Sequence, residues 1–201
     1  MGKGKARERR QARTREAIIQ AAEEIIETRG PDALNMRDVA ELIDYSASNL
    51  YEYFASKDEL LAAVANGALT RLAMQIHQSA TALSPRERLL AYGRSYLEFA
   101  RTHAQLYLLT FGRKLAHCVL TDPEQAPSSY NLLLQIVREG IEAAVFVPRP
   151  DFGLQEMTFG CWSIVHGLAM LRLTMQDVPW ETVTASDQQI VECFVDGLSH
   201  G

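Results

Sequence analysis

The sequence predicts an all-α protein, and three of its features agree on this. Apolar residues recur with helical spacing almost without interruption from about Thr14 onward. No segment combines alternating apolar and polar residues with the β-branched enrichment that a strand requires. Helix-start signals recur along the chain, which has 201 residues, 47% of them hydrophobic, enough for one sizeable core or two modest ones. We expect about nine helices in total.

The first helix is expected from about Thr14 to Arg29. Its apolar residues recur at i, i+3, i+4, i+7 and i+8, and they are Ile18, Ala21, Ala22, Ile25 and Ile26. Gly30 follows as a C-cap glycine, and Pro31 cannot continue the helix. The chain therefore has to break its first helix here.

Two short helices are expected next. Asn35 is the predicted N-cap of the first one, and Ser46 is the predicted N-cap of the second, which covers 46–54. Only Asp44 and Tyr45 separate the two helices, so a tight turn joins them.

The longer helices that follow have recognisable starts. Capping boxes open three of them, namely Ser56 with Glu59 before 57–77, Ser84 with Glu87 before 85–102, and Ser186 with Gln189 before 187–198. The other helices are expected over 104–111, 129–145 and 153–175. Residues 112–127 form the longest connection.

Charge is distributed unevenly along the chain. The formal net charge is -5, yet residues 1–16 carry seven basic and two acidic side chains. Residues 58–201 carry ten basic and fifteen acidic ones. The basic N-terminal arm is therefore suited to a polyanion, whereas the rest of the chain is not.

Several classes of protein are disfavoured. No apolar run approaches the roughly 18 residues of a membrane span, and the N-terminus lacks the apolar core of a secretory signal, so we expect a cytoplasmic protein without a membrane partner. Cys118, Cys161 and Cys193 lack a C-x-x-C pair and are interpreted as small core residues. Neither H-E-x-x-H, nor a glycine-rich phosphate loop, nor G-x-S-x-G occurs, so no enzyme, metal site or cofactor is predicted.

Two short helices joined by a tight turn, behind an amphipathic helix and a basic arm, favour a helix-turn-helix DNA reader. Ser48 and Asn49 project from the second short helix and are short enough to approach base edges. Tyr51 and Tyr53 flank them, where a phenol can reach a phosphate. The predicted DNA-binding residues are Arg10, Arg13, Asn35, Met36, Arg37, Ser46, Ala47, Ser48, Asn49, Tyr51, Tyr53 and Lys57.

The segment NMRDVAELIDYSASNLYEYFASKDELL, with its flanks over about residues 14–64, resembles the DNA-binding domain of the TetR family of transcriptional regulators. The matching residues are Val39-Ala40, Ser46, Leu50-Tyr51, Phe54, Lys57 and Leu60. Where the family usually has Ala-Gly-Val at the turn, this chain has Ile43-Asp44-Tyr45, and Asp tolerates left-handed backbone. The resemblance implies a DNA-binding domain over 1–64 and a ligand-binding and dimerisation domain over 65–201.

A second resemblance covers the C-terminal half. Trp162, His166 and Gly167 match the W-x-x-x-H-G signature of one TetR C-terminal subfamily. The resemblance implies a homodimer through the last two helices and an internal cavity for a small-molecule effector. The candidate ligand-binding residues are Tyr96, Phe99, Tyr107, Phe111, Met157, Trp162, His166 and Met170. Helical spacing alone makes the same side chains ordinary core residues, so both interpretations stay open.

The function expected from these features is ligand-responsive regulation of transcription. The chain would bind a palindromic operator in double-stranded DNA as a dimer, most often as a repressor, and a small apolar or aromatic effector would release it. The alternative is a helical DNA-binding protein without such an effector, gated by a partner protein or acting architecturally. Ligand-dependent release from DNA distinguishes the two.

Overall fold

The structure is a computed structural model that describes residues 2–79, 84–111, 128–175, 177–180 and 186–199. Within these ranges the chain forms nine α-helices and one short 3-10 helix, and the only β pairing is an isolated bridge between Arg149 and Phe152. The all-α prediction is therefore confirmed. None of the described helices is long and apolar enough to cross a membrane.

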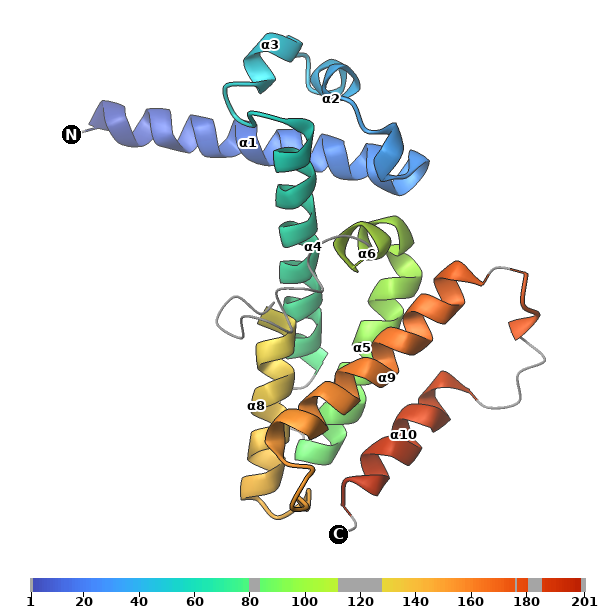
Figure 1. The fold of residues 1–201 in the computed structure, drawn as a ribbon. Coiled ribbons are helices and arrows are strands. Elements are labelled where there is room, and N and C mark those ends of the chain that lie inside the picture. The colour runs from blue at the N-terminus through green and yellow to red at the C-terminus, as the bar shows by residue number, and fades with distance from the viewer. Residues whose placement is uncertain (1, 80–83, 112–127, 176, 181–185, 200–201) are drawn as a thin grey trace. The chain divides into compact units, whose positions relative to one another are not determined.

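The chain divides into two compact units (Figure 1). The first unit comprises Met1–Ala68 and Gln105–Arg113, and the second comprises Leu69–Ala104 and Lys114–Gly201. The helix at 104–111 thus belongs almost entirely with the N-terminal residues.

The first unit is built around α1 (Gly2–Arg29). The other elements are η1 (Pro31–Ala33), α2 (Met36–Leu42), α3 (Ala47–Leu50), the first half of α4 (Lys57–Ser79) and α6 (Ala104–Phe111). Figure 1 shows α2 and α3 on one side of α1. The stripe predicted from Ile18 to Ile26 is buried, and α1 ends at Gly30, whose φ of 81° only glycine adopts readily.

The basic arm is helical, which the sequence analysis did not expect. α1 begins at Gly2 instead of near Thr14. Residues 2–13 contain no proline and consist mostly of Lys, Arg, Ala, Gln and Glu, which are good helix formers. They extend a helix whose nucleus is already stabilised by the buried stripe, so each further residue adds one hydrogen bond at low cost.

The second unit packs α5 (Pro85–Thr102), α8 (Ser128–Glu142), α9 (Leu154–Thr174) and α10 (Asp187–Gly197) against one another. Two of the three predicted capping boxes, at Ser84 and Ser186, are present. At Ser56 one half of the box is present, because Ser56 Oγ accepts from Glu59 N at 3.1 Å, but Glu59 Oε2 accepts from the main-chain N–H of Ala55 at 2.7 Å.

The end of α8 is earlier than predicted. The helix stops at Glu142 instead of residue 145, and Ala144 has a φ of 54°. Phe146 folds back so that its ring covers Gly140, where any Cβ would overlap the ring. This contact, together with the bonds from Val145 N and Phe146 N to Gly140 O, ends the helix.

α10 lies close to both α5 and α9. A Cβ on Gly93 would lie 3.0 Å from Val191 Cγ1, and a Cβ on Gly160 would lie 2.8 Å from Phe194 Cζ. The cysteine prediction is correct for Cys161, which is buried, and wrong for Cys193, which is exposed on α10. Cys118 lies outside the described residues.

Candidate functional site

The turn between α2 and α3 depends on Asp44. Its φ is 56°, in the left-handed region that the sequence analysis expected an aspartate to tolerate. The turn closes through Tyr45 N, which donates to Ala40 O at 2.9 Å. Tyr45 Oη also lies 3.4 Å from Thr14 Oγ1 on α1, which links the turn to the long helix.

α3 presents a polar face and buries an apolar one. Ser46 caps the helix by accepting from Asn49 N at 3.3 Å. Leu50 and Phe54 are fully buried, whereas Ser48 and Asn49 are exposed. The regular helix ends at Leu50, and residues 51–53 continue as turns, so it is shorter than the predicted 46–54.

Several of the predicted phosphate-contacting side chains are exposed. Arg10, Arg13 and Arg37 are exposed, and so is Tyr51, at 53%. Tyr53 is half-buried. Their part in phosphate contacts, which supply much of the affinity of protein–DNA complexes, stays a prediction.

Some of the predicted contact residues have structural tasks. Asn35 caps α2 by accepting from the N–H groups of Arg37 and Asp38 at 3.1 and 2.9 Å. Met36 is buried, so its side chain is not available for the predicted DNA contact. Lys57 Nζ donates to Asp32 O at 3.2 Å, which ties the start of α4 to η1. Ala47 is half-buried.

Arg15 is a residue that the sequence analysis did not single out. Its guanidinium lies 4.7 Å from the centre of the Phe54 ring, so it packs against the end of the reading segment. Arg15 and Phe54 are far apart in the sequence, so only the fold reveals this contact. One of the seven basic residues of the arm therefore has a packing role.

Three of the predicted ligand residues form an aromatic cluster in the second unit, which consists of Tyr96, Trp162 and His166. Trp162 Nε1 donates to Tyr96 Oη at 3.3 Å, and Tyr96 Oη lies 3.2 Å from His166 Nδ1. The rings of Trp162 and His166 stack at 5.0 Å. Burial lowers the pKa of His166, so Nδ1 of the neutral ring is suited to accept from the tyrosine.

The other ligand candidates are distributed over both units. Phe99 and Met157 are buried in the second unit, where Met170 is half-buried. Tyr107 and Phe111 belong to the first unit, with their ring centres 4.7 Å apart. None of the eight predicted residues lines the grooves and the cavity described next, so their role in ligand binding stays a prediction.

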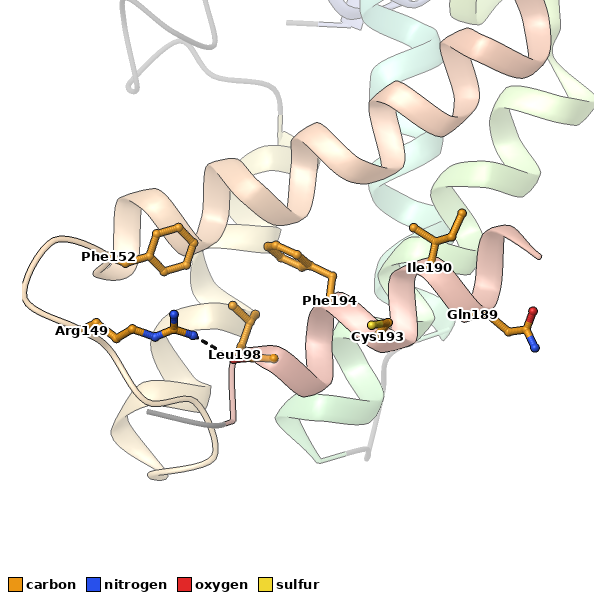
Figure 2. A pocket seen from close by; sticks show the side chains of 8 residues that line it. Arg149, Phe152, Gln189, Ile190, Cys193, Phe194 and Leu198 are labelled. Atoms are coloured by element: carbon orange, nitrogen blue, oxygen red, sulfur yellow. Dashed lines mark hydrogen bonds between the residues drawn. The ribbon is translucent and has the colours of Figure 1, made fainter. Parts of the chain in front are cut away.

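The described part of the second unit carries surface grooves on three sides of its helices, beside α10, α5 and α4. The largest, of about 650 Å³, lies beside α10 and contains the rings of Phe152 and Phe194, which point toward each other in Figure 2. Arg149 closes one end by donating to Gly197 O at 3.2 Å. Grooves of about 600 and 590 Å³ lie along α5 and α4. A cavity of about 10 Å³ lies inside the unit, beside Tyr92.

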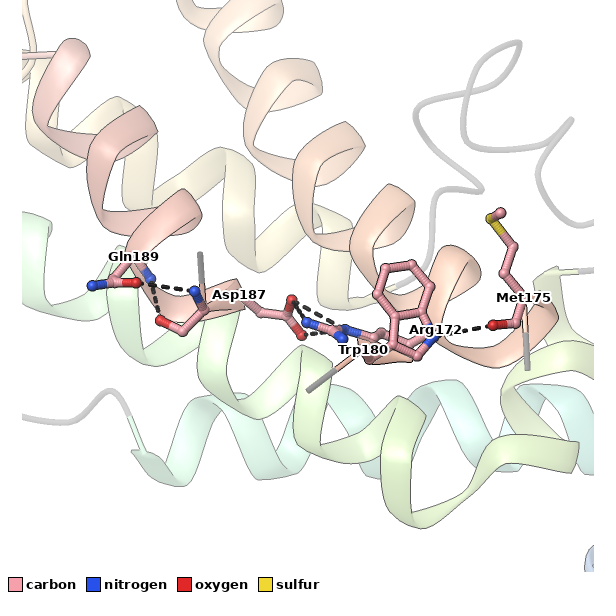
Figure 3. A network of polar contacts seen from close by, with 6 residues as sticks. Arg172, Met175, Trp180, Asp187 and Gln189 are labelled. Carbon is pink, nitrogen blue, oxygen red and sulfur yellow. Dashed lines mark hydrogen bonds and ion pairs between the residues drawn. The ribbon is translucent and has the colours of Figure 1, made fainter. Parts of the chain in front are cut away.

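A polar clamp holds α9 and α10 together (Figure 3). Arg172 Nη2, in the last turn of α9, donates to Asp187 Oδ1 at 2.7 Å, in the first turn of α10. The guanidinium also lies 4.4 Å from the ring of Trp180, whose Nε1 donates to Met175 O at 3.1 Å. Trp180 and the first turn of α10 are therefore both held to the end of α9.

These features define a class of protein, the helical DNA-binding regulators. In this chain the helix-turn-helix of α2 and α3 follows a basic helix and precedes a second helical unit. Comparison with known proteins supports this class. Residues 18–64 match the bacterial regulatory proteins of the tetR family, and residues 89–194 match the tetracyclin repressor-like C-terminal domain. The chain belongs to the TetR family of transcriptional regulators.

Individual relatives agree with this assignment. An HTH-type transcriptional repressor of Mycobacterium tuberculosis is 35% identical over 66 residues, which are 33% of this chain and only 35% of that protein. A protein of unknown function from Rhodococcus sp. RHA1 has the same fold, with a TM-score of 0.74 at 24% identity. The match covers 92% of this chain and 95% of the Rhodococcus chain. RolR, in complex with resorcinol, has a similar fold, with a TM-score of 0.68 at 18% identity. The match covers 94% of this chain and 89% of RolR.

Proposed function

We propose that the protein is a cytoplasmic repressor that binds a palindromic operator as a homodimer and is released by a small apolar or aromatic effector. The observation that carries the proposal is the exposed pair Ser48 and Asn49 on α3, held between the left-handed turn at Asp44 and the buried Leu50. The two α3 segments of a dimer would enter successive major grooves about 34 Å apart.

The DNA-binding part is tested by selecting bound duplexes from a random library and then measuring affinities. Asn49→Ala removes a side chain that can make two hydrogen bonds to a base, so we expect a loss of about 1–3 kcal/mol and relaxed preference at one operator position per half-site. Asn131→Ala, which removes the same exposed amide from α8, is the matched control. Unchanged affinity and preference in Asn49→Ala would remove this residue from the reading face.

The homodimer is supported by apolar surface that α9 and α10 leave uncovered. Of the residues on these helices, Val165, Ala169, Val191, Val195 and Leu198 are buried within the chain. Ile164, Leu168, Ile190 and Phe194 are only half-buried, and Leu171 is 45% exposed. Such surface is suited to a two-fold interface formed by the same two helices of each copy.

The effector is supported by the aromatic cluster and by a protein of similar fold. Tyr96 and Trp162 combine apolar faces with polar atoms that can orient a ligand. The solved structure of RolR contains resorcinol, a small aromatic molecule. A regulator of this kind should lose operator affinity when its effector binds, and linkage requires the operator to weaken effector binding by the same factor.

The effector is tested by a thermal-shift screen of small aromatic compounds, followed by operator titrations with each hit. Trp162→Ala should abolish binding of a genuine hit. The alternative function, a DNA-binding protein gated by a partner or acting architecturally, predicts that no compound in the screen weakens operator binding.

A further inference from the structure

Tyr92 is a buried polar residue that has no role in the function proposed so far. Its side chain is 1% exposed on α5, and within the described part of the chain its Oη has no hydrogen-bond partner. A buried hydroxyl without a partner destabilises a protein, because it loses its bonds to water and gains nothing in exchange. Phenylalanine would fill the same space without this cost, so the hydroxyl needs an explanation.

Tyr92 adjoins the aromatic cluster. Its ring stacks on that of Tyr96 at 6.0 Å, with 22° between the planes. Burial raises the pKa of Tyr92 well above its ordinary value, and the neighbouring Tyr96, Cys161 and Tyr130 raise it further. The hydroxyl therefore keeps its proton and is available as a donor. Tyr92 lies one helical turn before Tyr96, and this i, i+4 spacing could have revealed it from the sequence.

The small cavity beside Tyr92 has an uncharged lining. Its walls are Leu89 and Tyr92 from α5, Cys161, Ile164 and Val165 from α9, and Val191, Phe194 and Val195 from α10. Burial raises the pKa of the Cys161 thiol to about 12, so it too stays neutral. A volume of about 10 Å³ is close to the smallest that holds one water molecule. A larger occupant requires the half-buried Phe194 and α10 to move.

We propose that Tyr92 Oη is the polar anchor of an internal effector site between α5, α9 and α10, which takes a small uncharged molecule with a hydroxyl group on an apolar body. The inference rests on the proposed function, in which the second unit senses a small molecule. An ion would lose its hydration among these walls without a compensating charge, which excludes charged ligands. A hydroxyl can accept the proton of Tyr92 Oη.

The cavity shares a residue with the surface that we assign to the dimer, which offers a route from ligand binding to operator binding. Phe194 lines the cavity and also the groove of Figure 2, on the face of α10 that we assign to the dimer. A ligand that displaces Phe194 therefore changes the surface seen by the second copy. The ligand shifts the dimer geometry by as much as its affinities for the two arrangements differ.

The first experiment uses the ligand-free full chain. Tyr92→Phe removes an unpartnered hydroxyl, so its Tm should rise by about 2 °C or more. Tyr96→Phe is the matched control, because the same substitution one turn later removes the bonds to Trp162 and His166 and should lower the Tm. A lower Tm for Tyr92→Phe would show that a trapped water already satisfies the hydroxyl. It would overturn the proposal that Tyr92 Oη is available to bind a ligand.

The second experiment measures calorimetrically how phenol and toluene, which are similar in size, bind to the wild type and to Tyr92→Phe. The ratio of the phenol to the toluene association constant should be at least about fivefold higher for the wild type. An equal ratio in the two proteins, or no binding of phenol, overturns the anchor. Failure of the proposed function has a different result. In that case phenol binds at Tyr92, but no compound weakens operator binding.

Discussion

At the scale of single residues, Asp44 sets the geometry of the turn between α2 and α3. A left-handed backbone costs most L-residues about 1–2 kcal/mol, and aspartate less. Asp44→Gly should therefore be as stable as the wild type or more so, and should retain operator binding. Asp44→Val places a β-branched side chain at a φ of 56° and should lower the free energy of unfolding by about 1–2 kcal/mol. Chemical denaturation measures both variants, and a fully stable Asp44→Val protein would contradict the role of the turn.

His166 gives the second unit a predictable response to pH. Burial lowers the pKa of His166 in the folded protein, whereas the unfolded chain has the ordinary value near 6.5. The unfolded state therefore binds the proton first, so stability is fully present above pH 6.5 and is lost as the pH falls toward the folded pKa.

The measurement is the Tm at pH 7.5 and at pH 5.5. We expect a larger fall for the wild type than for His166→Asn, whose amide oxygen lies at the position of Nδ1 and can still accept from Tyr96 but does not titrate. The same fall in both proteins would show that other groups control the response.

At the scale of elements, α1 joins the basic arm to the core of the reader. Replacing Arg10 and Arg13 by Gln should flatten the dependence of the logarithm of operator affinity on the logarithm of salt concentration. Each lost phosphate contact contributes about 0.9 to this slope. The preferred sequence should stay nearly the same, because phosphate contacts do not identify bases.

The control for this variant is Arg101→Gln, which removes one positive charge, against two in the double variant, from an exposed position on α5. Filter binding at several salt concentrations gives the slopes. If the double variant and Arg101→Gln have the same slope as the wild type, then the arm makes no phosphate contacts.

Elements whose limits are set by neighbouring residues were predictable from the sequence. Ser84 with Glu87 and Ser186 with Gln189 form capping boxes as expected, because both partners lie within four residues. The end of α8 was not predictable, since it depends on how Phe146 packs on Gly140. The same holds for the site: the exposure of Asn49 follows from helical periodicity, whereas the unpartnered hydroxyl of Tyr92 depends on four helices packing together.

At the scale of the whole molecule, operator binding should require two copies. Phe194→Asp would bury an unpaired charge in the proposed interface, at a cost of about 3–5 kcal/mol. The dimer should weaken about 100-fold or more, and operator affinity should fall with it. Gln155→Glu adds the same charge at an exposed position on α9 and is the control. Analytical ultracentrifugation gives the assembly state, and a wild type that sediments as a monomer at micromolar concentration would refute the interface.

The helical state of residues 2–13 also limits where the N-terminus can go on DNA. An α-helix with its side chains is about 10–12 Å across, whereas the minor groove of B-DNA is only about 6 Å wide. An arm that continues α1 as a helix cannot enter that groove and must follow the outer sugar–phosphate surface. The bases flanking the operator core should then show only a weak bias toward A·T pairs, because the main chain stays outside the groove and only long side chains can reach the base edges.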